Sequence, residues 1–198
     1  MKKIIMLAAM ACTVTLTSCK DDKRDEVVED KVETTTVETT KSEDMNTGTA
    51  DKKVTVQMNP KSDSNVSGSI VFRQDGKTVS MTALFSGLTP GMHAIHLHEN
   101  GDCSSADGKS AGGHWEGMSA MHGKWGEGDH HSGDIGNLEA NAEGNASLSF
   151  STDKWCIGCG DAAKDVMGHS VIVHAGVDDL KSQPSGAAGA RVACGVIR

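Results

Sequence analysis

The stretch VSMTALF, residues 79–85, places Val79, Met81, Ala83 and Phe85 at every second position. Successive side chains of a β-strand point to opposite faces of a sheet, so this spacing predicts a strand with one buried face. The same alternation occurs in VTVQM (54–58) and ASLSF (146–150), and shorter apolar runs lie at 70–72, 170–174 and 191–197. Glycine-containing turn pairs separate these runs, and no segment has a convincing helical period. The pattern therefore predicts an all-β domain, either a sandwich or a barrel.

One glycine-rich segment, residues 99–134, shows little alternation and is too long for an idle loop in a compact domain. Such a loop needs something to order it, and a metal ion would serve. His114, His122 and His131 lie inside the segment, and Asp134 ends it.

Further histidines flank this loop. His96 and His98 are two residues apart on a predicted strand, so their rings leave the same face, and His174 ends a later apolar run. Six imidazoles and one carboxylate are too many donors for one tetrahedral ion, but they suit two ions that share a ligand. Donors of this kind favour zinc or copper over calcium or magnesium. The sequence therefore predicts a binuclear metal site.

The chain divides into a leader, a tether and one domain. Residues 1–18 predict a targeting segment, since Lys2 and Lys3 precede an apolar stretch. The segment LTSC (16–19) resembles the lipobox of bacterial lipoproteins, which implies a lipid anchor on Cys19; an ordinary secretory signal is the alternative. Residues 19–52 are charged and predict a flexible tether, and residues 53–198 have the size of one domain. The formal net charge of −8 argues against nucleic acid as a partner.

Five segments resemble the copper–zinc superoxide dismutases: HAIHLHENGDC (93–103), AGGHWEG (111–117), HSGDIGN (131–137), VIVHAGVDD (171–179) and GARVACGVI (189–197). The resemblance spans residues 53–198 and preserves order and spacing, so it is far more specific than one short motif. It implies a Greek-key β-sandwich, or flattened eight-stranded barrel, with long metal-binding and electrostatic loops.

Position by position, the resemblance implies one copper ion and one zinc ion per subunit. The copper ligands would be His96, His98, His114 and His174, and the zinc ligands would be His114, His122, His131 and Asp134. His114 would bridge the two ions. Spacing favours His131 over His130 as the ligand, while His93 and His169 match no ligand position and are expected to be structural.

Two further residues gain roles from the resemblance. Asp178 matches an aspartate that links a copper histidine to a zinc histidine from outside the ligand shell, which fixes ring orientation. Arg191 matches the arginine that attracts the anionic substrate. Because the chain is acidic overall, a local positive funnel is needed, and Lys124 and Lys181 are candidates for it.

Four cysteines remain after the leader and Cys19, and thiols outside the cytosol are expected to be paired. Cys103 and Cys194 match the family's disulfide. Cys156 and Cys159, in WCIGCG, depart from the family pattern. A local bridge is the preferred interpretation of this pair, with a redox pair or an accessory copper site as alternatives.

The resemblance implies an enzyme that disproportionates superoxide to oxygen and hydrogen peroxide, with His114 and Arg191 as catalytic residues. A surface lipoprotein that holds copper or zinc without catalysis is the main alternative, and a purely structural sandwich is the third. With Cys19 lipidated, we expect the bacterial envelope, as an outer-membrane lipoprotein that faces the periplasm or the cell surface. A homodimer is compatible with the resemblance.

Overall fold

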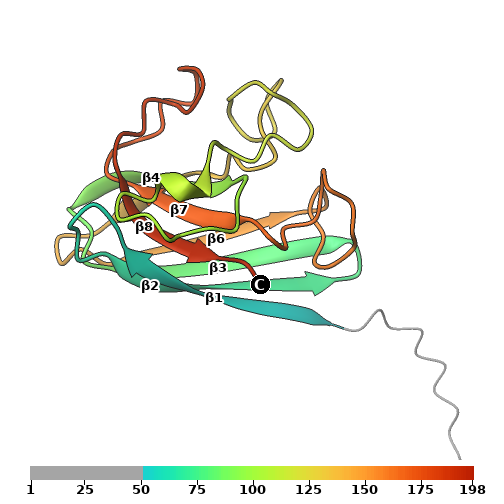
Figure 1. Cartoon of the computed structure of the whole chain (residues 1–198), viewed down its shortest axis with the longest axis horizontal. Coiled ribbons are helices and arrows are strands. Elements are labelled where there is room, and N and C mark those ends of the chain that lie inside the picture. Colours follow the sequence, from blue (N-terminus) through green and yellow to red (C-terminus); the bar gives the residue numbers. More distant parts are fainter. Residues whose placement is uncertain (1–50) are drawn as a thin grey trace, which may run out of the picture. The chain divides into compact units, whose positions relative to one another are not determined.

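The structure is a computed structural model that describes residues 51–198. Eight strands close into a barrel in the order β1-β2-β3-β6-β5-β4-β7-β8 (Figure 1). The strands are β1 (Lys52–Pro60), β2 (Ser67–Asp75), β3 (Thr78–Ser86), β4 (Gly91–His98), β5 (Gly136–Ala140), β6 (Ala146–Thr152), β7 (Ser170–His174) and β8 (Arg191–Val196). Within the described part, the one helical segment is a short 3-10 turn, η1 (Lys109–Ala111). The predicted all-β, eight-stranded fold is confirmed.

Every strand pairing is antiparallel, and three of them join strands that are not consecutive in the chain; one of these, β1 with β8, closes the barrel. β3 pairs with β6, and β4 pairs with β7, so the chain crosses between the two sides of the barrel in the Greek-key manner. Long connections follow β4 and β7, and both extend from the same side of the barrel in Figure 1. The topology therefore brings two long loops together beside β4, β7 and β8.

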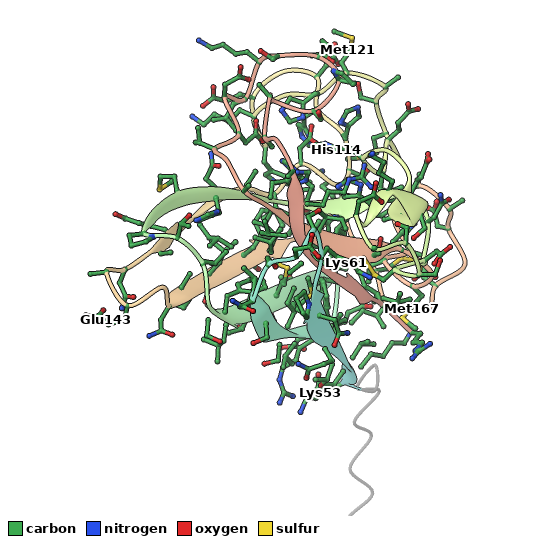
Figure 2. The ribbon with its side chains drawn as sticks, turned by 60° about the vertical axis from the view of Figure 1, so that its left-hand side comes forward. Lys53, Lys61, His114, Met121, Glu143 and Met167 are labelled. Atoms are coloured by element: carbon green, nitrogen blue, oxygen red, sulfur yellow. A yellow bond between two sulfur atoms is a disulfide. The ribbon has the colours of Figure 1, made fainter. Side chains whose placement is uncertain are left out.

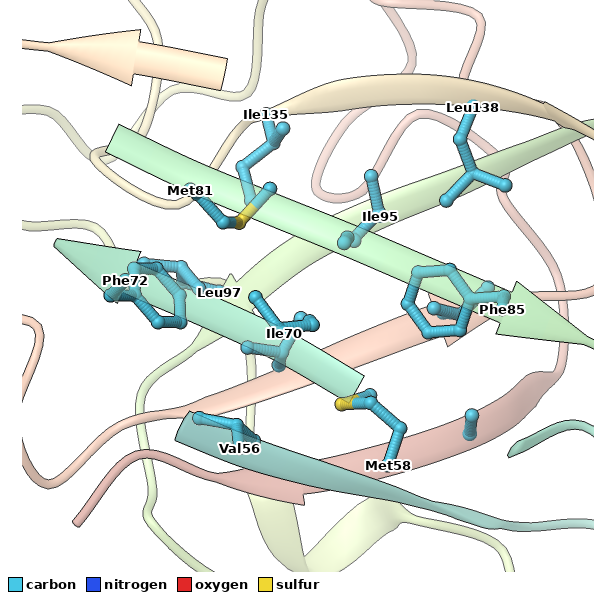
Figure 3. Packing of buried hydrophobic residues seen from close by; sticks show 14 of the residues in the cluster. Val56, Met58, Ile70, Phe72, Met81, Phe85, Ile95, Leu97, Ile135 and Leu138 are labelled. Atoms are coloured by element: carbon cyan, nitrogen blue, oxygen red, sulfur yellow. The ribbon is translucent and has the colours of Figure 1, made fainter. Parts of the chain in front are cut away.

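The core lies between the two layers and follows the alternation of the sequence. In β3 every second residue is buried, from Val79 to Phe85, as the spacing predicted. Figure 3 shows Phe72, Met81 and Ile95 packed in this interior. Burial of each such side chain stabilises the fold by about 1.5–3 kcal/mol before entropy costs, so this cluster provides the rigid base for the loops.

Three elements differ from the sequence prediction. β5 was not anticipated, because Leu138 and Ala140 are its only fully buried residues and give too short an alternation. β2 runs for nine residues, although the apolar run predicted only 70–72, because polar and glycine residues complete its pairing with β3. β1 begins at Lys52, one residue before the predicted start of the domain.

The predicted leader, Cys19 and nearly all of the predicted tether lie outside the described residues. Within residues 51–198, we find no helix with the length and apolar character needed to cross a membrane.

Candidate metal centre

β4 carries the first two histidines of the centre. Its last six residues are all buried, so both faces of the strand are covered. Ile95 and Leu97 belong to the hydrophobic core, while His96 and His98 leave the opposite face. Alternation along one strand therefore separates an apolar side from a side that carries imidazoles.

The long loop after β4 folds back over the end of that strand. Trp115 N donates to Leu97 O at 2.9 Å, and Leu97 N donates to Gly133 O at 2.9 Å. A Cβ on residue 133 would collide with the Leu97 carbonyl, so glycine is required where the backbones approach this closely. This hydrogen bonding places His114 directly opposite His98.

His174 reaches the same place from the end of β7. The register between β7 and β8 shifts between Val173 and His174, where His174 pairs with Arg191. A bulge of this kind bends the strand and re-aims the side chain that follows it. Figure 2 shows His114 on this loop side of the barrel, with Met121 farther out.

The first group of donors is formed by four buried rings. Each ring offers one donor atom, and these atoms lie within 4.8 Å of one another: His96, His98, His114 and His174. Each ring also has one buried nitrogen without a hydrogen-bond partner among the described residues, namely His96 Nδ1 and the Nε2 atoms of His98, His114 and His174. Unpaired buried nitrogens are costly, so four of them in one place fit a cation that accepts their lone pairs.

The second group of donors converges on one carboxylate oxygen. Asp134 Oδ1 lies 2.8 Å from His114 Nδ1, 3.0 Å from His122 Nδ1 and 3.1 Å from His131 Nδ1. A tetrahedral zinc shell with bonds of about 2.0 Å has edges of about 3.3 Å, close to these separations. The other carboxylate oxygen accepts from the backbone N–H groups of Gly123 and His131 at 3.0 and 2.9 Å. The donors therefore fit a small tetrahedral cation.

His114 belongs to both groups. Its Nδ1 faces Asp134, whereas its Nε2 is unpartnered within the described chain and its ring lies 4.0 Å from that of His96. The structure thus brings all seven predicted donors into two adjoining groups that share one ring.

Asp178 connects the two groups from outside. His96 Nε2 lies 2.8 Å from Asp178 Oδ2, and His122 Nε2 lies 2.9 Å from Asp178 Oδ1. Gly186 passes so close to this carboxylate that a Cβ would overlap it, and its φ of 64° also favours glycine. Because a carboxylate accepts hydrogen bonds, it holds the proton of each ring on Nε2 and leaves Nδ1 free.

Backbone carbonyls orient the two other rings of the first group. His98 Nδ1 donates to Gly112 O at 3.0 Å, and His174 Nδ1 donates to Gly189 O at 3.2 Å. A carbonyl can only accept, so these contacts fix the tautomers and leave each Nε2 with its lone pair.

Burial keeps the first group in the form that binds cations. Desolvation lowers the pKa of His174 to about 3 and that of His114 to about 4, and it lowers the pKa values of His96 and His98. These rings are therefore neutral at pH 7, as metal ligation requires.

The carboxylates of the centre are ionised. Burial raises the pKa of Asp134, but its hydrogen bonds with His114, His122 and His131 outweigh that effect and hold the pKa far below its usual range. The pKa of Asp178 is likewise lowered, because hydrogen bonds with His122 and His96 outweigh its burial. Two negative charges at this place favour a cation.

Arg191 stands at the opening of the centre. Its Nη1 donates to Gly108 O at 2.8 Å and its Nη2 to Gly112 O at 2.6 Å. It lines a pocket of about 180 Å³ together with His98, Gly113, His114, His174, Pro184, Ser185 and Gly189. A fixed cation beside a small pocket suits a small anion.

The remaining predicted residues are placed as follows. The structure joins Cys103 to Cys194, which ties the loop to β8, and it joins Cys156 to Cys159 locally. His93 is structural: its ring contacts the carbonyl oxygens of His174 at 2.9 Å and Thr89 at 2.8 Å.

Three other predictions concern residues at the edge of the centre. His130 Nδ1 contacts the carbonyl of its neighbour His131, and His169 stacks on Trp115. Neither ring belongs to a donor group in the described chain. Lys124 donates to Glu127 at 2.5 Å, which offsets its charge and weakens its candidacy for the funnel.

Sequence reasoning missed Gln183. Its Oε1 accepts from His122 N at 2.9 Å, and its Nε2 donates to His122 O at 2.8 Å. The loop after β7 thereby holds His122, a predicted zinc ligand, by its backbone. A glutamine 61 residues away in the sequence gives no periodic signal, so only the fold reveals this contact.

Comparison with known proteins gives the same picture. A model of the family described as copper/zinc superoxide dismutase matches residues 66–197. The chain is 41% identical over 140 residues to a "Superoxide dismutase [Cu-Zn]" of Caulobacter vibrioides, covering 69% of this chain and 80% of that protein. It is 40% identical over 143 residues to a protein of the same name from Onchocerca volvulus, covering 67% and 88%. An "Extracellular superoxide dismutase [Cu-Zn]" of Brugia pahangi is 37% identical over 142 residues, covering 67% and 69%.

Proposed function

The chain belongs to the copper/zinc superoxide dismutase family, and we propose that the centre described above converts superoxide to oxygen and hydrogen peroxide. Its cofactors are copper and zinc. The observation that carries the proposal is the meeting of four unpartnered imidazole nitrogens with Arg191 at one small pocket. A site that only stored metal would have no need for a fixed cation beside its opening.

We assign the ions by the chemistry of the donors. Copper would be held by His96, His98, His114 and His174, since an all-nitrogen shell with an open side suits this ion. Zinc would be held by His114, His122, His131 and Asp134, which provide a closed tetrahedral shell. When bound, copper supplies one-electron redox chemistry, and zinc supplies a fixed positive charge without redox change.

His114 supplies the proton site of the reaction. Its Nε2 has no partner in the described chain, and the ring lines the pocket. Burial lowers the pKa of the metal-free ring to about 4, so the ring is neutral at pH 7 and its Nε2 keeps a lone pair that can accept a proton. His114 Nδ1 faces Asp134 and the proposed zinc position, so the ring would stay in place while Nε2 gains and loses its proton.

Arg191 draws the substrate toward the pocket. Two backbone carbonyls fix its guanidinium, so the charge is placed before the substrate arrives. With the charge of Lys124 offset by Glu127, Arg191 carries much of the attraction that an acidic protein needs for an anion.

The test combines metal analysis with kinetics on the same samples. Protein loaded with one copper and one zinc ion should accelerate superoxide decay in pulse radiolysis, in proportion to its copper content. If protein with both ions bound gave superoxide decay no faster than buffer alone, the proposal would be overturned in favour of a non-catalytic metal-binding lipoprotein.

We also propose that residues 1–18 are removed, that Cys19 is lipidated and that residues 19–52 tether the domain (53–198) to the outer membrane. The lipobox-like LTSC segment supports this, and the names of relatives described as extracellular are compatible with a location outside the cytoplasm. Mass spectrometry of the N-terminal peptide should show a diacylglyceryl cysteine; an unmodified N-terminus elsewhere would contradict it. A homodimer stays a prediction, which sedimentation analysis tests.

A further inference from the structure

The second disulfide lies apart from the metal centre, in the segment between β6 and β7. Cys156 and Cys159 are three residues apart, whereas Cys103 and Cys194 are separated by 91 residues. A bridge stabilises a fold chiefly by restricting the unfolded chain, and the restriction grows with the size of the closed loop. The short bridge is therefore a weak cross-link beside the long one.

The surrounding loop is held without the sulfur atoms. The Asp165 carboxylate accepts from Gly158 N and Gly160 N at 2.8 Å each. Cys156 N donates to Lys164 O at 2.8 Å, and Val166 N donates to Cys156 O at 3.0 Å. These contacts pin the segment on both sides of the bridge, so its opening leaves the backbone in place.

Ile157, which lies inside the bridged segment, is anchored to the barrel as well. Ile157 N donates to Gln74 Oε1 at 2.7 Å, and Lys52 Nζ donates to Ile157 O at 2.6 Å. Both partners belong to strands of the barrel, which connects the loop to β1 and β2 independently of the bridge.

One sulfur is open to an incoming reactant and the other is covered. Cys159 is exposed, while Cys156 is only 9% exposed. Gly158 and Gly160 flank Cys159, and apart from their chain neighbours no described atom lies within 4 Å of the position that a Cβ would take on either. The loop therefore exposes Cys159 at its tip, with the Asp165 carboxylate within 4.8 Å of the cysteine sulfur atoms on the inner side.

We propose that Cys156–Cys159 is a thiol–disulfide exchange site that a dithiol reductant opens while the barrel stays folded. A thiolate of the reductant attacks the Cys159 sulfur, the bond to Cys156 breaks, and Cys156 leaves as a thiolate that takes up a proton. The second thiol of the reductant then attacks the mixed disulfide and releases Cys159. Two electrons and two protons pass to the protein, and the reductant leaves as its own disulfide.

The test uses the metal-loaded protein under native conditions. After incubation with dithiothreitol and alkylation, peptide mass spectrometry should show alkyl groups on Cys156 and Cys159, while Cys103 and Cys194 remain joined. Far-ultraviolet circular dichroism and the melting temperature should stay close to those of the oxidised protein. Resistance of the short bridge until the domain unfolds, or unfolding caused by its reduction, would overturn the proposal.

Two single variants locate the site of attack. Cys156→Ser leaves Cys159 free and should react with an aromatic disulfide reagent about tenfold faster than Cys159→Ser, which leaves the covered Cys156. Equal rates, or the reverse order, would show that Cys159 is not the entry point. The double variant Cys156→Ser/Cys159→Ser is the folding control and should keep the melting temperature and the superoxide activity of the parent.

Discussion

Arg191 and His98 share one hydrogen-bond acceptor, the carbonyl oxygen of Gly112, to which Arg191 Nη2 donates at 2.6 Å and His98 Nδ1 at 3.0 Å. The guanidinium proposed to attract the substrate and a ring proposed to bind copper are thus placed by the same atom. Cys194 lies three residues beyond Arg191, and its disulfide with Cys103 holds the loop that carries this carbonyl. Attraction and metal binding therefore have a common structural support.

Substitution of Arg191 should reduce the rate of superoxide decay. Arg191→Ala removes the charge, and we expect a loss of roughly tenfold or more in the second-order rate constant. Arg191→Lys keeps the charge but cannot donate to both carbonyls, so it should be intermediate. Pulse radiolysis at increasing salt measures the effect, and a variant with the parent's rate and salt dependence would contradict it.

His114 and His174 should differ in which ions they affect. His114→Ala removes a donor from both groups, so copper and zinc contents should fall together, whereas His174→Ala should lower copper mainly. Elemental analysis after dialysis against a chelator measures both ions. Full zinc occupancy and an unchanged copper spectrum in His114→Ala would show that the ring is not shared.

Loss of the Asp178 carboxylate should weaken zinc binding. Asp178→Asn leaves one amide in place of two acceptors for His96 and His122, and such partners of ligands contribute about 10–100-fold in metal affinity. Competition with a chromophoric chelator measures the zinc affinity. The neighbouring Asp179→Asn is the matched control, since Asp179 is exposed and bonds only within its own loop in the described chain. Equal affinities in the two variants would contradict the role of Asp178.

The Gln183 contact should slow zinc release. Gln183→Ala removes two hydrogen bonds to the His122 backbone, worth about 1 kcal/mol net at an exposed position, which corresponds to roughly fivefold faster release. Stopped-flow mixing with a chelator measures the rate. Ser182→Ala is the control from the same loop. An identical rate of zinc release in both variants would contradict a role for the two Gln183–His122 hydrogen bonds.

The metal-free domain should lose stability as pH falls from about 6.5 to 4. The pKa values of His174 and His114 are lowered by burial to about 3 and about 4, so the folded state stays neutral there while the unfolded chain binds protons. Proton uptake then favours unfolding, by about 2 kcal/mol or more across this window. Urea unfolding of the metal-free protein at several pH values measures this change in the free energy of unfolding. A constant free energy of unfolding between pH 6.5 and 4 would refute the expectation.

On the alkaline side, His122 acts with the opposite sign. Burial lowers its pKa, but hydrogen bonds with Asp134 and Asp178 outweigh burial and raise the pKa to about 9. Its contribution is therefore fully present below about 6.5 and is lost as pH rises through 9. The same urea series, extended upward, should show stability declining toward pH 9.

The parts of the fold with regular burial were predictable from sequence, and the parts held by single contacts were not. β3 alternates over its whole length because one face meets the core. β5 contributes too few buried residues to give a pattern, although its pairing with β4 and β6 closes the barrel.

Some features of the metal centre were likewise predictable from the sequence, and others were not. Ligand types and their spacing are local properties, so the histidine series predicted a binuclear site. The hydrogen bonds to the Gly112 carbonyl and those between Gln183 and His122 join segments that meet only after folding. No residue type marks a backbone oxygen as an acceptor for Arg191.

Asp178 contacts His96, a proposed copper ligand, and His122, a proposed zinc ligand. Binding of one ion would therefore be thermodynamically linked to binding of the other. If bound zinc changes the affinity for copper by some factor, bound copper must change the affinity for zinc by the same factor. The final occupancies would consequently be the same whichever element the protein meets first.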